Sequence, residues 1–95
     1  MKTHLNRIEY ADKSTYWRKL NGKLHREDGP AIEKANGSKS WWLNGELHRE
    51  DGPAVEDADG TKEWWLNDKL IVKGKQPENW NELVALYQVM KVMDD

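Results

Sequence analysis

A 23-residue unit occurs twice in tandem and limits what this chain can fold into. The segment from Leu20 to Trp42 reads LNGKLHREDGPAIEKANGSKSWW, and the segment from Leu43 to Trp65 reads LNGELHREDGPAVEDADGTKEWW. Both copies share an Asn-Gly pair, the block LHREDGPA and a closing Trp-Trp pair at the same spacing. Repetition at a period of about 20 to 50 residues is typical of folds that stack one supersecondary unit on the next. The sequence therefore predicts a repeat architecture.

Weaker copies flank the two full units, and we expect one domain of residues 1–95. A partial copy occupies residues 8–19, the full units occupy 20–42 and 43–65, and a decayed copy occupies 66–74. Residues 77–93 carry a different pattern. A chain of 95 residues has the usual size of one small domain.

Turn signals divide each unit into short segments. Asn-Gly or Asp-Gly pairs stand at 21–22, 36–37, 44–45 and 59–60, and Asn67-Asp68 is a degraded version. These dipeptides favour two-residue hairpin turns, in which both central residues have positive φ. The Asp-Gly-Pro of each block marks a further turn, because proline interrupts the hydrogen bonds of a strand. The pattern predicts successive antiparallel hairpins.

Two-residue turns would also decide which side chains share a face of the sheet. Around Asn36-Gly37, Ile32 would pair with Trp41 and Ala31 with Trp42; paired residues share a face, and neighbours along a strand alternate. One face is then expected to collect Ile32, Trp41, Leu43, His48, Val55, Trp64, Leu66 and Ile71, with Leu20 and His25. The other is expected to collect Ala31, Trp42, Leu47, Ala54, Trp65 and Leu70, with Leu24.

The C-terminal segment is predicted to form a helix that covers one face. Trp80, Leu83, Val84, Tyr87 and Met90 recur at helical spacing. A helix over residues 78–93 would be roughly 24 Å long, enough to cross several strands. The alternative is a helix that binds a partner or a second copy. The predicted fold is mainly β with one C-terminal α-helix: tandem antiparallel hairpins form a twisted repeat sheet, and an amphipathic helix caps it.

Composition excludes several classes of function. The net charge is −2 and basic runs are missing, which argues against nucleic acid or a membrane surface as the partner. Without cysteine the chain has neither disulfides nor thiolate metal ligands. Nothing resembles a signal peptide or a bilayer-spanning segment, so a cytoplasmic location is expected.

The histidines and aspartates of the repeated block invite a metal or acid–base interpretation. The same residues recur in both units, however, whereas a catalytic site needs different residues with divergent roles. We therefore assign turn formation and packing, in preference to ligand or metal binding, to His25, His48, Asp28, Asp51, Gly29 and Gly52. No catalytic or phosphate-binding motif is recognised, so no enzymatic activity, cofactor or metal is expected.

The tandem tryptophans suggest an interaction surface. Adjacent side chains of a strand point to opposite faces, so we expect Trp42 and Trp65 to lie on a face that the helix leaves open. Exposed aromatic surface on a small protein is typical of an interface; burial within the sheet is the alternative. The residues expected to contact a partner are Trp42, Trp65, Trp41, Trp64, Glu33, Glu56, Asp57 and Glu63.

The unit resembles the MORN repeat in its period and in several positions. Trp42-Leu43-Asn44-Gly45, His48 and Asp59-Gly60 fall in register, whereas Ser40 and Glu63 replace glycines of that pattern. A closer likeness, over Trp17 to Leu70, is to small proteins of tailed bacteriophages with tandem LHREDGPA-type units.

The resemblance implies a binding module without enzymatic activity. It would be a phage accessory protein that blocks a host protein, such as a component of antiviral defence, by occlusion in the bacterial cytoplasm. The alternatives are a self-associating structural protein, such as a homodimer, and a binder of a small ligand or lipid headgroup.

Overall fold

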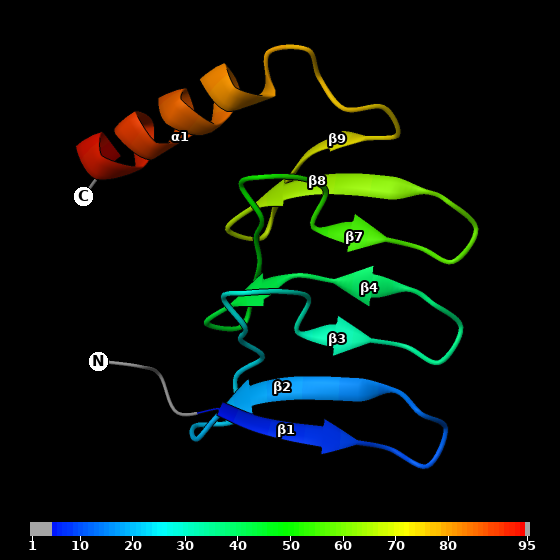
Figure 1. The fold of residues 1–95 in the computed structure, drawn as a ribbon. Helices are drawn as coiled ribbons and strands as arrows, with labels where there is room; N and C mark the ends of the chain where they lie inside the picture. Colours follow the sequence, from blue (N-terminus) through cyan, green and yellow to red (C-terminus); the bar gives the residue numbers. More distant parts are fainter. Residues whose placement is uncertain (1–4, 95) are drawn as a thin grey trace.

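The computed structural model describes residues 5–94 and confirms a mainly antiparallel sheet of hairpins with one C-terminal helix (Figure 1). The strands are β1 (Leu5–Glu9), β2 (Thr15–Lys19), β3 (Ile32–Glu33), β4 (Lys39–Ser40), β5 (Trp42–Leu43), β6 (Glu46–Leu47), β7 (Val55–Glu56), β8 (Lys62–Leu66) and β9 (Lys69–Lys73), and the helix is α1 (Trp80–Asp94). A seven-stranded sheet has the order β1-β2-β3-β4-β7-β8-β9, and β5 pairs with β6 separately.

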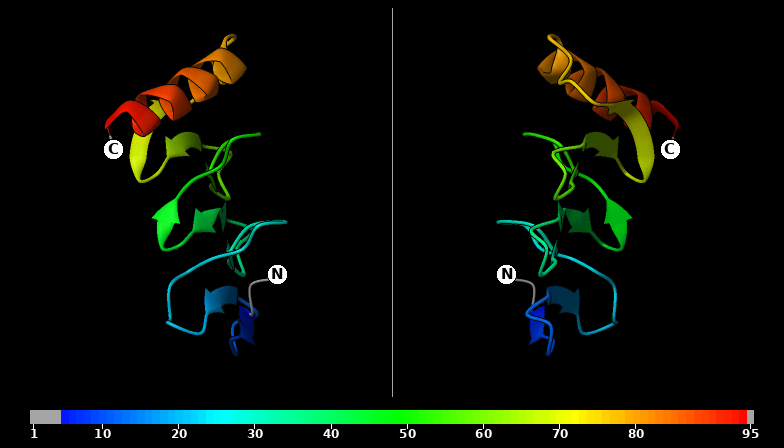
Figure 2. Two further views of the ribbon diagram at one scale, coloured as in Figure 1. Left: turned by 90° about the vertical axis from the view of Figure 1, so that its left-hand side faces the viewer. Right: turned by 90° about the vertical axis from the view of Figure 1, so that its right-hand side faces the viewer.

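Each full unit places its LHREDGPA block outside the sheet. We call residues 25–30 the first arm and residues 48–53 the second arm. Both arms protrude on the same side of the sheet, one above the other (Figure 2). Backbone hydrogen bonds join each arm to the last residue of its own unit, from Arg26 N–H to Trp42 O (3.1 Å) and from Arg49 N–H to Trp65 O (3.2 Å). Bonds between units start just before the arms, from Gly45 N–H to Leu24 O (2.8 Å) and from Asp68 N–H to Leu47 O (2.9 Å), so the repeats stack there as well as through the sheet.

Two of the expected two-residue turns are present. Asn44 and Gly45 have φ of 51° and 82°, and Asn67 and Asp68 have φ of 46° and 66°. Leu43 accordingly pairs with Glu46 across the first of these turns.

The other three Asx-Gly pairs lie in three-residue loops, so the prediction of two-residue turns was wrong there. In Ala35-Asn36-Gly37 only the glycine has positive φ (96°), and Lys34 N–H bonds Ser38 O across the loop (2.8 Å). The Asn36 side chain accepts the Ser38 N–H (2.9 Å), which stabilises the longer loop. The loops at 20–22 and 58–60 repeat this arrangement. Leu20 consequently lies in a loop and is 73% exposed instead of packing on a face.

The extra loop residue moves Ile32 and Val55 to the face opposite to the expected one, and Ala31 and Ala54, which alternate with them, move the other way. Ile32 pairs with Ser40 and not with Trp41, and Val55 likewise pairs with Ser40. A one-residue change of register reverses the facing of every side chain in a strand. Ile32 and Val55 therefore share a face with Trp42 and Trp65, which we call the back face. The arm face carries Trp17, Trp41 and Trp64 together with the two arms.

The main core lies at the C-terminal end of the stack and is closed by the helix. Trp64 and Leu66 pack with Trp80 and Val84, and the Trp80 indole donates to Glu50 O of the second arm (2.8 Å). The helix begins at Trp80, later than expected, and lies across the end of the stack instead of over a whole face (Figures 1 and 2). Within residues 5–94, no helix is long and apolar enough to cross a membrane.

The loop between β1 and β2 allows a test of the three-residue loop geometry. Lys13 has φ of 75° at the position that Gly37 and Gly60 occupy in the later units. A left-handed conformation costs a non-glycine residue roughly 1 kcal/mol. We expect Lys13→Gly to raise the free energy of unfolding by up to about 1 kcal/mol in chemical denaturation, because glycine adopts this conformation without strain.

Ala11→Gly in the same loop is the matched control. Ala11 does not have positive φ, so glycine there should lower the free energy of unfolding by about 0.5–1 kcal/mol. Equal destabilisation by the two substitutions would contradict the loop geometry.

Candidate functional site

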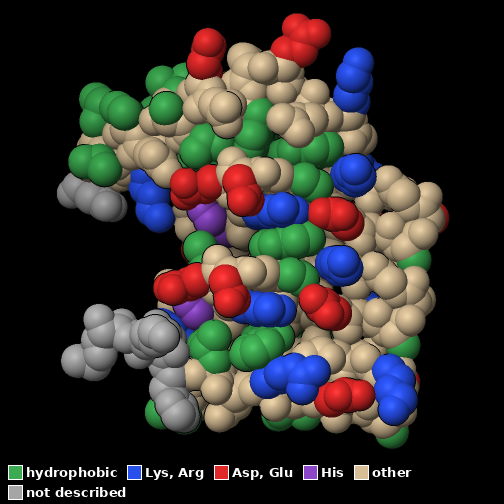
Figure 3. All heavy atoms as spheres, in the orientation of Figure 1, with side chains coloured by type: hydrophobic (Ala, Val, Ile, Leu, Met, Phe, Trp, Pro, Cys, Tyr) green, Lys and Arg blue, Asp and Glu red, His purple; other side chains and the backbone are tan. Residues whose placement is uncertain are grey.

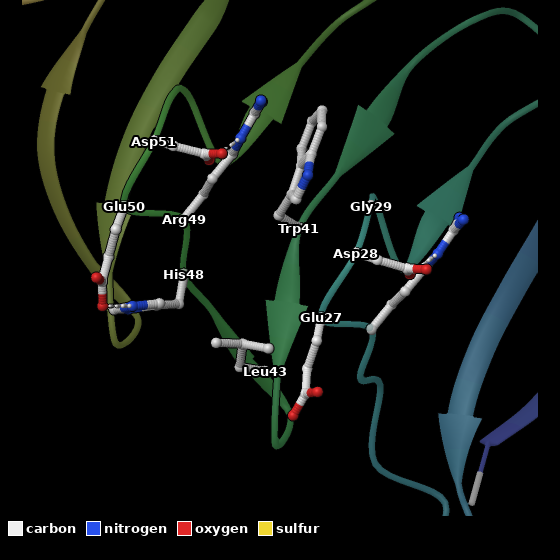
Figure 4. A pocket seen from close by; sticks show the side chains of 10 residues that line it. Glu27, Asp28, Gly29, Trp41, Leu43, His48, Arg49, Glu50 and Asp51 are labelled. Carbon is white, nitrogen blue, oxygen red and sulfur yellow. Dashed lines mark hydrogen bonds and ion pairs between the residues drawn. The ribbon is translucent and has the colours of Figure 1, made fainter. Parts of the chain in front are cut away.

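An open hollow lies between the two arms on the arm face. Its volume is about 610 Å³. It is lined by Arg26, Glu27, Asp28, Gly29, Trp41, Leu43, His48, Arg49, Glu50 and Asp51 (Figure 4). Trp41 and Leu43 come from the strand segment between the arms and form an apolar floor, and the arms supply charged walls.

Each arm is held in place by its arginine. The Arg49 guanidinium lies 3.9 Å from the Trp41 ring centroid and donates to Asp51 Oδ1 (2.9 Å) and Pro53 O (3.0 Å). This combines a cation–π contact with a charge-assisted hydrogen bond. The first arm repeats the contacts with Arg26, Trp17, Asp28 and Pro30 at 4.4, 2.9 and 3.2 Å. Both guanidiniums thus stabilise the arms through contacts within the chain.

Glycine is required at the position of each arm where the arginine side chain packs against the backbone. A Cβ added to Gly52 would lie 2.8 Å from Arg49 Cζ, and one added to Gly29 would lie 2.9 Å from Arg26 Cζ. Such distances are shorter than a side-chain contact allows, so any other residue would displace the guanidinium. The Asp-Gly-Pro turn is therefore fitted to the arginine two residues before its aspartate.

The histidines connect one unit to the next. His25 Nδ1 accepts the Asn44 N–H (2.9 Å), and His48 Nδ1 accepts the Asn67 N–H (3.0 Å). A ring nitrogen that accepts a hydrogen bond carries no proton, so the proton of each neutral ring lies on Nε2. His48 Nε2 donates to Glu50 Oε2 at 2.9 Å. Both rings are buried and link the turns of successive units.

Two serines make a similar link at the opposite edge of the sheet. Ser14 Oγ accepts the Ala35 N–H (3.1 Å), and Ser38 Oγ accepts the Ala58 N–H (3.0 Å). These hydroxyls are acceptors for the backbone of the following loop.

The rim of the hollow is acidic. Glu27, Asp28 and Asp51 side chains are 72%, 86% and 87% exposed, and Glu50 also borders the opening. Figure 3 shows two rows of charged side chains, in which Asp and Glu lie beside Lys and Arg, on either side of an apolar strip. The guanidiniums of Arg26 and Arg49 are already engaged by Asp28 and Asp51. Four carboxylates therefore face two arginines whose charges are used within the arms.

Three aspartates are held in their ionised form. The Arg26 hydrogen bond and charge lower the pKa of Asp28. Backbone N–H groups two residues on, those of Ser14 and Thr61, lower the pKa of Asp12 and of Asp59.

The residues predicted to contact a partner do not form one surface. Trp42 and Trp65 are half-buried on the back face, where their indoles donate to Ser40 Oγ and Glu63 Oε1 (both 2.8 Å). Trp64 is only 2% exposed, because it packs in the core beside the helix, and so it presents no free surface. The remaining residues are distributed as follows: Trp41 floors the hollow, Glu56 lies 3.0 Å and Glu33 3.8 Å from the arginines of the arms, and Asp57 is exposed at a loop.

The roles of Arg26 and Arg49 and the hollow between the arms were not predicted from the sequence. The signal that was present is the Arg-x-Asp-Gly-Pro spacing, which recurs in both units beside the tryptophans. Asp28 and Asp51 do shape their turns, but they do so by binding the arginine.

Comparison with known proteins found no matching family model, no matching curated protein and no matching solved structure. Among residues 5–94, His, Asp and Glu side chains do not gather in a group of three that could hold a metal ion.

The arginine–glycine fit predicts a strong coupling between two substitutions. Gly52→Ala should lower the free energy of unfolding by about 1–3 kcal/mol, because the new methyl group displaces the Arg49 guanidinium. In an Arg49→Ala background the same change should cost much less. A double-mutant cycle in chemical denaturation measures this difference. Additive costs would show that the guanidinium is not what requires glycine.

The lowered pKa values of Asp12, Asp28 and Asp59 predict that the fold loses stability in acid. Their pKa values are lower in the folded chain than in the unfolded chain, so they stabilise the fold fully above about pH 5. This contribution is lost as the pH falls through their lowered values, which lie below the usual 3.8. Chemical denaturation at a series of pH values should show this fall in the free energy of unfolding.

Asparagine provides a control for this pH dependence, because Asn36 already fills the position of Asp12 and Asp59 in the equivalent loop. Asp12→Asn with Asp59→Asn keeps the hydrogen-bond acceptor of both loops and removes the titration. The variant should lose less stability between pH 5 and pH 3 than the natural chain, and an unchanged pH dependence would contradict the assignment to these carboxylates.

Proposed function

We propose that this protein is a non-enzymatic module that binds another protein, and that the hollow receives a positively charged segment of that partner. The observation that carries the proposal is the acidic rim around the Trp41 floor, with both guanidiniums engaged within the arms. A lysine or arginine side chain would gain both the carboxylates and the apolar floor. Complementary charge of this kind favours fast and specific association.

The chemistry of the hollow supports binding in preference to catalysis. Both ring nitrogens of His48 form hydrogen bonds, and the acids nearest to it are tied to that ring or to Arg49. A general base needs a proton-accepting atom directed at a substrate. The acidic rim also disfavours anionic lipid headgroups, which are attracted by basic residues.

The likeness to phage proteins with LHREDGPA-type units suggests the kind of partner. We infer a protein of the bacterial host, such as a component of antiviral defence. The module would act in the host cytoplasm and would block its target by covering a basic segment.

The back face is a second candidate surface. Ile32, Trp42, Val55 and Trp65 repeat there at the spacing of the unit, and all four side chains are half-buried. Aromatic residues are enriched among the energetically dominant residues of interfaces.

Charge variants and aromatic variants distinguish the two surfaces. In a pull-down from bacterial lysate with the tagged chain, Glu27→Lys with Glu50→Gln should reduce capture of the principal bound protein about tenfold or more, since rim charges steer and hold a basic partner. Gln keeps an oxygen acceptor for His48. Trp42→Ala with Trp65→Ala should leave capture by a folded variant unchanged.

The matched control applies the same change in charge outside the hollow, as Asp57→Lys with Glu78→Gln. It should capture the partner as the natural chain does, and raising the salt concentration should weaken capture by both. Loss of capture in the tryptophan variant alone would move the binding site to the back face.

A further inference from the structure

We propose that the outer face of α1 is a homodimer interface, in which the helices of two copies pair antiparallel about a twofold axis beside Val89. Most homo-oligomers have such closed symmetry, in which the same patch serves both copies. This surface shares no residue with the hollow, so the inference is independent of the proposed function.

The helix is apolar on two opposite sides. At 3.6 residues per turn, Trp80, Val84 and Tyr87 follow the side that packs on the sheet. The residues of the opposite side are Ala85, Leu86, Val89, Val92 and Met93. Leu86, Val89, Val92 and Met93 are 57%, 56%, 74% and 78% exposed. An apolar stripe along a helix normally packs against another element, so this outer stripe lacks its cover.

The space-filling view supports the same conclusion. Hydrophobic side chains gather over the C-terminal half of α1, where the helix extends beyond the sheet (Figures 1 and 3). Four of the stripe residues also border a shallow depression together with Gln88. The patch is therefore continuous and is not a scatter of single exposed residues.

The charges on the chain favour a second copy of this helix as the occupant. Lys91 is the one charged residue between Ala85 and Met93, and its Nζ turns to Asn67 Oδ1 of its own chain (3.3 Å). Over this segment, two such stripes therefore meet without like charges; Glu82, on the same side of the helix, lies before it. Self-pairing of the edge strands is less favourable: antiparallel pairing would oppose Lys69 to Lys73 in β9 and Arg7 to its own copy in β1.

The side-chain sizes are complementary under antiparallel pairing. With Val89 opposite Val89 of the second copy, each residue faces the one that lies equally far on the other side of position 89. Leu86 then meets Val92, and the small Ala85 meets the long Met93. Alternation of small and large residues across a helix contact allows close packing.

Sedimentation of the full chain over a range of concentrations tests the proposal. The natural chain should show a concentration-dependent monomer–dimer equilibrium. Val89→Glu should raise the dissociation constant at least about tenfold, because a charge would face its own copy on the axis. Val92→Lys gives a second disruption, and circular dichroism checks that both variants are folded. Leu20→Glu, at an exposed leucine of a distant loop, should leave the equilibrium unchanged.

Cysteine crosslinking tests the geometry, since the natural chain has no cysteine. Val89→Cys should form disulfide-linked dimers on mild oxidation much faster than Leu20→Cys, because only the former lies beside the axis. A chain that sediments as monomer at every concentration would overturn the inference. Equal crosslinking rates, or a dimer that Val89→Glu and Val92→Lys leave intact, would overturn it as well.

Discussion

Stacking of an arginine on a tryptophan is the interaction on which each repeat depends. Strands β3 to β7 are only two residues long each, and such short ladders hold few hydrogen bonds. Arg49 fastens the second arm by contacting Trp41, Asp51 and Pro53 at once. The arm in turn bonds the end of its own unit through the Arg49 N–H and the following unit through His48. Each block thus closes its own unit and joins the next.

This use of the block explains why its chemistry recurs unchanged. The aspartate orients the guanidinium, the glycine leaves room for it, and the histidine accepts a backbone N–H from the next turn. These side chains make the same structural contacts in both copies. The repetition does create a new feature, because two stacked arms enclose a hollow that a single arm could not form.

The C-terminal helix replaces the arm that the third copy has lost. The residue 23 positions after Arg49 is Val72, which cannot stack on Trp64 as a cation. Trp80 packs on Trp64 instead and bonds the second arm at Glu50 O. The helix thereby ends the stack and covers its last tryptophan. It also introduces an uncovered apolar stripe on its outer side, which the stack itself does not explain.

The sequence by itself determined the repeat, the antiparallel hairpins and the C-terminal helix, because turn dipeptides and side-chain periodicity act over a few residues. It did not determine the length of the loop around Asn36, which depends on a side-chain hydrogen bond, and so it placed Ile32 and Val55 on the wrong face. The sequence by itself also did not predict the hollow. Contacts such as that of His48 with Asn67 join residues of different units. Only the tertiary structure brings those units together, and with them the two acidic walls.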